Sequence, residues 1–172
     1  MKIGIIGNGF VGKATNILAN EEVELIVYDI NPDLCIPVGT TLQELCTVDI
    51  IFISVPTPMN KDGSCYIGIL ETVIRNLKEI ISLDEKLVVC RSTVPVGACD
   101  NLNCYFMPEF LTEKNFINDF INNENWIFGI LEQDEKKDNE FKNKITILFN
   151  LAYENKKLCI IILILLVIQK QK

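Results

Sequence analysis

A turn of three glycines near the N-terminus constrains this chain more than any other feature. The segment from Lys2 to Ile6 is mostly β-branched and apolar, and it leads directly into Gly7, Asn8, Gly9, Phe10, Val11 and Gly12. Beyond the turn, apolar residues recur at helical spacing, at Phe10, Val11, Ala14, Ile17 and Leu18. A strand that leads into a helix through a glycine turn is the beginning of a βαβ unit.

The rest of the chain continues this alternation. Periodicity predicts further strands at Glu24 to Tyr28, Asp49 to Val55, Lys86 to Cys90, Cys104 to Met107 and Asn125 to Ile130. It predicts helices at Leu42 to Cys46, at Ile67 to Ile81 and around Phe141, Ile145, Leu148 and Ala152. We therefore expect an α/β fold, a Rossmann-like doubly wound and mostly parallel sheet in a single domain.

Composition excludes several classes of function. A chain of 172 residues suits one domain, and its net charge of −7 argues against a nucleic-acid partner. There is no histidine, and the seven cysteines form no CxxC pair, so we expect no metal site and buried reduced thiols. No secretory signal follows Met1, which favours a cytoplasmic location.

The last residues differ in character from the rest. Residues 1–155 carry the alternating pattern, whereas 156–172 contain an apolar run from Leu158 to Ile168. A bilayer span needs about 20 such residues, so a membrane role is not expected, and a buried strand or an off-frame tail are the alternatives. We interpret 156–172 as a tail produced by truncation or a frameshift.

In an open parallel sheet, ligands bind at the carboxyl ends of the strands. The first strand ends in a GxGxxG pattern, in which Gly7 permits a tight turn, Gly9 lets the backbone approach a pyrophosphate and Gly12 lets the helix pack on the strand. Three purely structural glycines are the alternative. Asp29 ends the second strand, where a carboxylate accepts hydrogen bonds from ribose hydroxyls and repels a 2′-phosphate; a solvated turn residue is the plainer interpretation.

Polar residues follow the later strands as well. Thr57, between two prolines, is either a cofactor contact or part of a loop breaker, and Thr93 is either a water-orienting hydroxyl or a helix cap. Glu109 and Glu113 are four residues apart, so on a helical turn they share one face. Two such carboxylates serve as a base and a substrate anchor in a cleft, and as a solvated helix face elsewhere.

Five motifs in order, GNGFVG, VYDINP, SVPTP, RSTVPVG and MPEFLTE, resemble the UDP-glucose/GDP-mannose dehydrogenase family from Met1 to about Asn155. The resemblance implies NAD as cofactor and a nucleotide sugar, with UDP-glucose favoured, as substrate. In that reaction a hydride passes from C6 of the sugar to NAD, and a cysteine captures the aldehyde. A second NAD then oxidises the adduct, and water releases the uronic acid.

The resemblance also assigns roles to residues. It places Gly7, Asn8, Gly9, Phe10, Val11, Gly12 and Asp29 on the adenosine half of NAD, with Thr57, Ser92 and Thr93 further along the cofactor. Glu109 is expected to assist thioester hydrolysis, with Thr93 orienting the water. The sugar site is expected to be lined by Glu109, Phe110, Leu111, Thr112 and Glu113, with Glu113 also near the nicotinamide.

The chain departs from the family pattern in two places. The stretch between Asp29 and Asp49 is shorter and lacks the basic residue that often follows the ribose-binding acid, and no cysteine stands in the nucleophile context. We therefore expect a C-terminal half or a homo-oligomer as partner.

Two alternatives stay open: a β-hydroxyacid dehydrogenase-like enzyme, and a non-catalytic NAD-binding module that is a degenerate gene product or half of a split enzyme.

Overall fold

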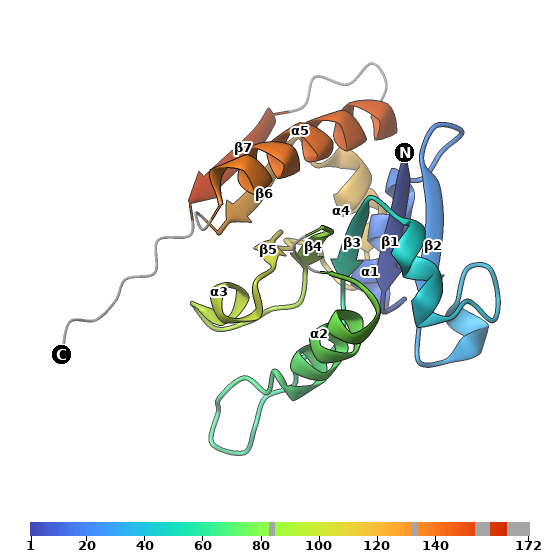
Figure 1. Cartoon of the computed structure of the whole chain (residues 1–172). Coiled ribbons are helices and arrows are strands. Elements are labelled where there is room, and N and C mark those ends of the chain that lie inside the picture. Colours follow the sequence, from blue (N-terminus) through green and yellow to red (C-terminus); the bar gives the residue numbers. More distant parts are fainter. Residues whose placement is uncertain (83–84, 132–133, 154–158, 165–172) are drawn as a thin grey trace.

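One mixed sheet organises the molecule (Figure 1). The computed structural model describes residues 1–82, 85–131 and 134–153, together with the backbone of 159–164. The strands in chain order are β1 (Lys2–Ile6), β2 (Glu24–Tyr28), β3 (Ile50–Ile53), β4 (Leu87–Cys90), β5 (Tyr105–Phe106), β6 (Asn125–Ile130) and β7 (Cys159–Ile164). They lie side by side in the order β2-β1-β3-β4-β5-β6-β7. Every pair is parallel except β5 with β6, which confirms the predicted doubly wound, mostly parallel sheet.

Helices cover both faces of this sheet. They are α1 (Phe10–Thr15), α2 (Gly68–Ile80), α3 (Ala98–Leu102), α4 (Phe116–Asn122) and α5 (Glu135–Ala152), with 3-10 turns η1 (Asn16–Leu18), η2 (Pro32–Leu34) and η3 (Leu42–Thr47). On one face, α1, α4 and α5 bury Ile5, Phe52 and Val89 of the central strands. On the other face, α2, α3 and η3 bury the alternate residues, such as Ile51 and Val88. Figure 1 shows α2 and α5 on opposite sides of the sheet.

Most of the predicted helices and strands are present, and the structure differs from the prediction mainly in where they end and in its short helices. β1, β2 and β6 have the predicted bounds, while β3 ends at Ile53 rather than Val55 because the chain turns away toward Pro56. The helix predicted at Leu42 to Cys46 is the 3-10 turn η3. The short helices α3 and α4 were not predicted, because five and seven residues carry too little periodicity to be recognised.

Part of the C-terminal apolar segment belongs to the sheet. β7 pairs in parallel with β6 from Asn125↔Cys159 to Ile130↔Ile164, so it forms an edge strand. Leu158 and residues 165–168 lie outside the described residues. In the part of the chain that the structure describes, no helix is both long and apolar enough to cross a bilayer.

Candidate functional site

The carboxyl ends of β1 to β4 surround two hollows that join into one groove. The β2 hollow, of about 340 Å³, lies between the end of β2 and α2, and the β4 hollow, of about 460 Å³, lies between the glycine turn and the end of β4. Residues that line both hollows are Gly7, Asp29, Ile30, Val55 and Pro56. The groove therefore crosses the sheet edge that the sequence predicted as the ligand site.

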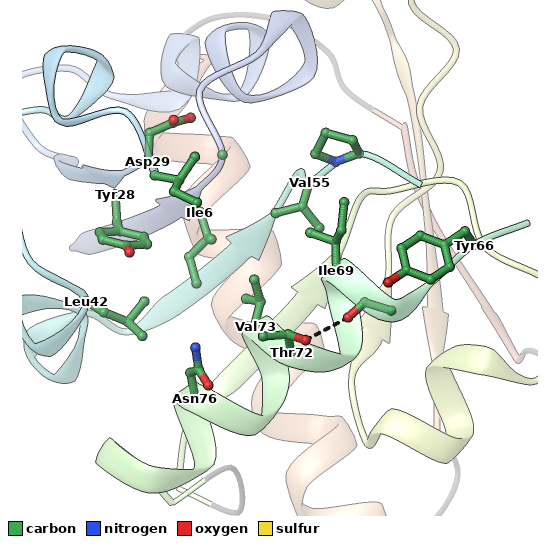
Figure 2. Close-up of a pocket in the computed structure, with 14 residues that line it drawn as sticks. Ile6, Tyr28, Asp29, Leu42, Val55, Tyr66, Ile69, Thr72, Val73 and Asn76 are labelled. Carbon is green, nitrogen blue, oxygen red and sulfur yellow. Dashed lines mark hydrogen bonds between the residues drawn. The ribbon is translucent and has the colours of Figure 1, made fainter. Parts of the chain in front are cut away.

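The β2 hollow has apolar walls and a few polar groups. Figure 2 shows Tyr28 and Leu42 on one side and Val73 of α2 on the other, with Asp29 at the rim. Thr72 and Asn76 of α2 add polar groups to the lining. A flat, largely apolar group with polar edges fits such a space.

The three glycines of the turn differ in why a side chain would or would not fit at each position. Gly7 has φ +91°, and a Cβ there would overlap the carbonyl oxygen of Ser54. A Cβ on Gly12 would overlap the carbonyl oxygen of Gly7, so this glycine lets α1 lie against the turn. A Cβ on Gly9 would meet nothing within 4 Å, and Gly9 lines the β4 hollow. The turn therefore leaves an open approach to its backbone at Gly9, which fits a bound pyrophosphate.

The Asp29 carboxylate borders both hollows and is held by two main-chain donors. The N–H of Asn8 donates to Oδ2 at 2.7 Å, and the N–H of Asn31 donates to Oδ1 at 2.9 Å. The Asn8 side chain is only 5% exposed and donates to the Leu34 carbonyl at 2.7 Å. Asn8 thus ties the glycine turn to the loop after β2, and its side chain is not among the groups that line the groove.

Ser92 and Thr57 connect the ends of β3 and β4. The buried Ser92 hydroxyl donates to the Val55 carbonyl at 2.7 Å and accepts from the Val55 N–H at 3.0 Å. The Thr57 hydroxyl donates to the Thr93 carbonyl at 2.7 Å. Thr93 itself is exposed and lines the β4 hollow beside Thr57 and Ser92. The structure therefore brings all three predicted hydroxyl residues to the same end of the groove.

Glu109 lines the β4 hollow together with the glycine turn, but the four residues after it do not. Glu109 is half-buried, lines the hollow and accepts from the Leu111 N–H at 3.2 Å. Neither hollow is lined by Phe110, Leu111, Thr112 or Glu113. Phe110 is 70% exposed and Glu113 is exposed, while Leu111 packs against the core on the α4 side.

Glu109 and Glu113 do not lie on a helical turn, the condition under which their spacing would put them on one face. The backbone is irregular from Met107 to Thr112, and α4 begins only at Phe116. The physical reason is a competing set of bonds: the N–H and the hydroxyl of Thr112 both donate to Asp119, at 2.7 and 2.6 Å. These bonds hold the pKa of the Asp119 carboxyl below its usual value. Glu109 and Glu113 consequently do not share a helix face.

Arg91 is a site residue that the sequence reasoning missed. It directly precedes Ser92, is 1% exposed and lines the β4 hollow together with Glu109. Its guanidinium donates to the Thr15 hydroxyl and lies 5.5 Å from the centre of the Phe120 ring. Burial lowers the pKa of Arg91 to about 10, and the nearby Glu109 partly opposes this effect. The sequence did contain a signal for Arg91, because a cationic residue stands directly before two hydroxyl residues at the end of a strand.

The described cysteines lie outside this groove. Six are free, and neither hollow is lined by any of them. Cys65 lies beside the β4 hollow, with its sulfur 3.6 Å from the Thr93 carbonyl and 3.9 Å from the Thr57 carbonyl.

A glycine turn, an acidic residue at the end of the second strand and a groove across parallel strands define a dinucleotide-binding domain of the dehydrogenase type. The chain belongs to the UDP-glucose/GDP-mannose dehydrogenase family, whose NAD binding domain matches residues 37–147. NAD is therefore its cofactor, as the sequence motifs predicted. The family match also decides against the β-hydroxyacid dehydrogenase alternative.

The chain is similar in sequence to a curated UDP-glucose 6-dehydrogenase and to a second protein, and in fold to a solved dehydrogenase. The chain is 26% identical to UDP-glucose 6-dehydrogenase of Rickettsia felis, over 84% of this chain and 40% of that protein. It is 32% identical to protein MJ1054 of Methanocaldococcus jannaschii, over 62% of this chain and 13% of the relative. The fold matches GDP-mannose dehydrogenase from Pseudomonas aeruginosa with a TM-score of 0.75 at 23% identity, covering 96% of this chain and 47% of that one. The chain thus spans less than half of these relatives.

Proposed function

We propose that the chain takes part in the NAD-dependent oxidation of a nucleotide sugar, UDP-glucose to UDP-glucuronate, and supplies the NAD-binding half of the enzyme. One observation carries the proposal: a single groove joins the glycine turn and Asp29 to Thr93 and Glu109. When bound, NAD supplies the hydride acceptor for such an oxidation. The family match and the Rickettsia felis relative support the substrate class.

The cofactor side of the groove suits NAD from end to end. The β2 hollow offers apolar walls to the adenine, and the Asp29 carboxylate has lone pairs left for the ribose hydroxyls. The open space at Gly9 and the N-terminus of α1 suit the pyrophosphate. In this proposal the cofactor continues toward Glu109 past Thr57, Ser92 and Thr93, which line the same hollow.

The reacting end of the groove contains a carboxylate and a hydroxyl. We assign Glu109 to activating water for hydrolysis and Thr93 to orienting that water, because both line the β4 hollow. Of the segment from Glu109 to Glu113, Glu109 lines the groove and borders the sugar site in this proposal, and the four residues after it would reach a bound sugar only from outside the two hollows. Arg91 places a buried positive charge behind Glu109.

The proposed oxidation to the acid needs a thiol beside the sugar carbon, and no described cysteine lines either hollow. We therefore propose that residues 1–155 form the NAD-binding domain, to whose sheet β7 adds an edge strand, and that a C-terminal half or another copy completes the site. We place the protein in the cytoplasm, where free thiols persist.

NADH formation with UDP-glucose tests the proposal. The purified chain is mixed with NAD and UDP-glucose, with and without a separately expressed C-terminal half of a related enzyme. We expect turnover only when that half is present. The Glu109→Gln variant should show no turnover even with that half. Steady turnover by the chain alone that is abolished by Cys65→Ser would contradict the need for an outside thiol. NAD binding without turnover on any nucleotide sugar, even with the added half, would favour a non-catalytic module, which the thiol-free groove also suits.

A further inference from the structure

The connection from β2 to β3 is built around a buried thiol. It contains no α-helix, only the 3-10 turns η2 and η3, and Cys35 near its centre is 3% exposed. The next residue, Ile36, pairs with Val27 of β2 through two main-chain hydrogen bonds of 2.8 and 2.9 Å. Cys35 is thereby held against the end of β2, where Asp29 begins the loop.

The Cys35 sulfur contacts both main-chain groups of Asp29. The Asp29 N–H donates to the sulfur at 3.3 Å, and the sulfur lies 3.4 Å from the Asp29 carbonyl oxygen. Two further carbonyls are near, Thr40 at 3.6 Å and Asn31 at 4.0 Å. A thiol has one hydrogen and donates to one of these carbonyls at a time, while its sulfur accepts from the N–H.

These contacts begin where the regular sheet stops. The last β1–β2 pair is Ile6 with Tyr28, so Asp29 is the first residue beyond the ladder. Its side chain is anchored separately, by the N–H groups of Asn8 and Asn31. The Cys35 thiol therefore holds the main chain of Asp29, whereas the main-chain N–H groups of Asn8 and Asn31 hold its carboxylate.

We propose that Cys35 is a positioning residue for NAD binding, which acts by fixing the Asp29 backbone so that the carboxylate faces the groove. The inference rests on the proposed function in one respect, the contact of Asp29 with the ribose. Cysteine suits this position because one atom must accept an N–H bond at 3.3 Å and reach three carbonyls from 3.4 to 4.0 Å away. A serine oxygen keeps both capacities at a shorter reach, and an alanine methyl has neither.

The test is a double-mutant cycle with titration calorimetry of NAD. Cys35→Ala is measured in the native background and in the Asp29→Ala background. Loss of a hydrogen-bond support should weaken NAD binding by about fivefold in the native background. In the Asp29→Ala background the same change should have no effect, because the group through which Cys35 acts is gone. Cys35→Ser should restore part of the affinity.

Cys46→Ala is the matched control. The Cys46 thiol donates to the Ile80 carbonyl at 3.4 Å and lines neither hollow, so NAD affinity should not change. If Cys35→Ala does not fold, Cys35→Ser is compared with the native chain in both backgrounds. If the Cys35 substitution lowers NAD affinity equally in the native and the Asp29→Ala backgrounds, the role of Cys35 is a general structural one and the proposal is overturned. Unchanged NAD affinity in a folded Cys35→Ala variant would also overturn it. Failure of the native chain and the Cys46→Ala control to bind NAD would instead count against the proposed function.

Discussion

The main-chain N–H of Asn8 donates a 2.7 Å hydrogen bond to the Asp29 carboxylate, which joins the glycine turn to the end of β2. The bond links the proposed pyrophosphate site to the proposed ribose site. Each carboxylate oxygen receives one main-chain N–H, from Asn8 or Asn31, and keeps a lone pair directed elsewhere. The proposed ribose contact can use the lone pairs that these two N–H groups leave open.

Asp29 should make the chain prefer NAD to NADP. In the proposed site its carboxylate accepts from the ribose hydroxyls and repels a 2′-phosphate, so Asp29→Asn should bring the two dissociation constants closer by roughly tenfold. Asparagine keeps an acceptor for the Asn8 N–H while it removes the charge. Titration calorimetry measures both affinities, with the exposed Asp33→Asn as control. Tighter binding of NADP than NAD by the native chain would refute the assignment.

Gly9 and Gly12 should respond to alanine in opposite ways. A Cβ on Gly12 meets the Gly7 carbonyl, so Gly12→Ala should lower the free energy of unfolding by about 1–3 kcal/mol. Gly9 has φ −70° and open space around its Cβ position, so Gly9→Ala should leave stability nearly unchanged. Urea unfolding of both variants measures this difference.

NAD affinity separates the two glycines further. The methyl group of Gly9→Ala enters the space reserved for the pyrophosphate, and a clash of about 1–3 kcal/mol weakens binding by roughly five- to a hundredfold. A Gly9→Ala variant that is stable and binds NAD like the native chain would place the pyrophosphate elsewhere in the groove.

Stability should fall steeply in alkali because of Tyr105 and Tyr153. Burial raises the pKa of both phenols above the usual value, and Asp138 adds to the effect at Tyr105. A raised pKa in the folded state stabilises the protein fully below the unfolded value of about 10, and this contribution is lost as the pH rises above it. Tyr105→Phe keeps the stacking on Phe141, at 3.8 Å between ring centres. In this variant the free energy of unfolding should fall less steeply as the pH rises. Unfolding by urea between neutral and alkaline pH measures the slope, and an identical slope in the native chain and Tyr105→Phe would contradict the prediction.

The sequence predicted the parts of the site that lie at the ends of regular elements. β1, the glycine turn, β2 and Asp29 follow one another with no tertiary information needed, because strand periodicity and glycine spacing define them. The Cys35 loop was not predicted, since its contacts depend on a β-bridge between Val27 and Ile36 that leaves no periodic pattern. The spacing of Glu109 and Glu113 would put both on one face of a helical turn, but no such turn forms, because the Thr112 bonds to Asp119 link residues seven apart and override the local helical spacing.

Arg91 should be replaceable by methionine with a gain in stability. Its guanidinium is 1% exposed and forms no salt bridge with any described residue, and its Nε has no hydrogen-bond partner. The Thr15 bond, the Phe120 ring and the charge of Glu109 offset part of the desolvation, and burial still lowers the pKa of Arg91. Methionine fills a similar volume without the charge, so Arg91→Met should raise the free energy of unfolding by about 1 kcal/mol.

The exposed Arg75→Met is the control for loss of an arginine, and its stability should stay within about 0.5 kcal/mol of the native chain. Urea unfolding at neutral pH compares the three proteins. A gain specific to Arg91→Met would mean that the native chain keeps a destabilising cation in the groove, which is expected of a functional group placed behind Glu109. A loss larger than that of Arg75→Met would mean that Thr15 and Phe120 outweigh the desolvation, and that Arg91 serves mainly to hold α1 and α4 together.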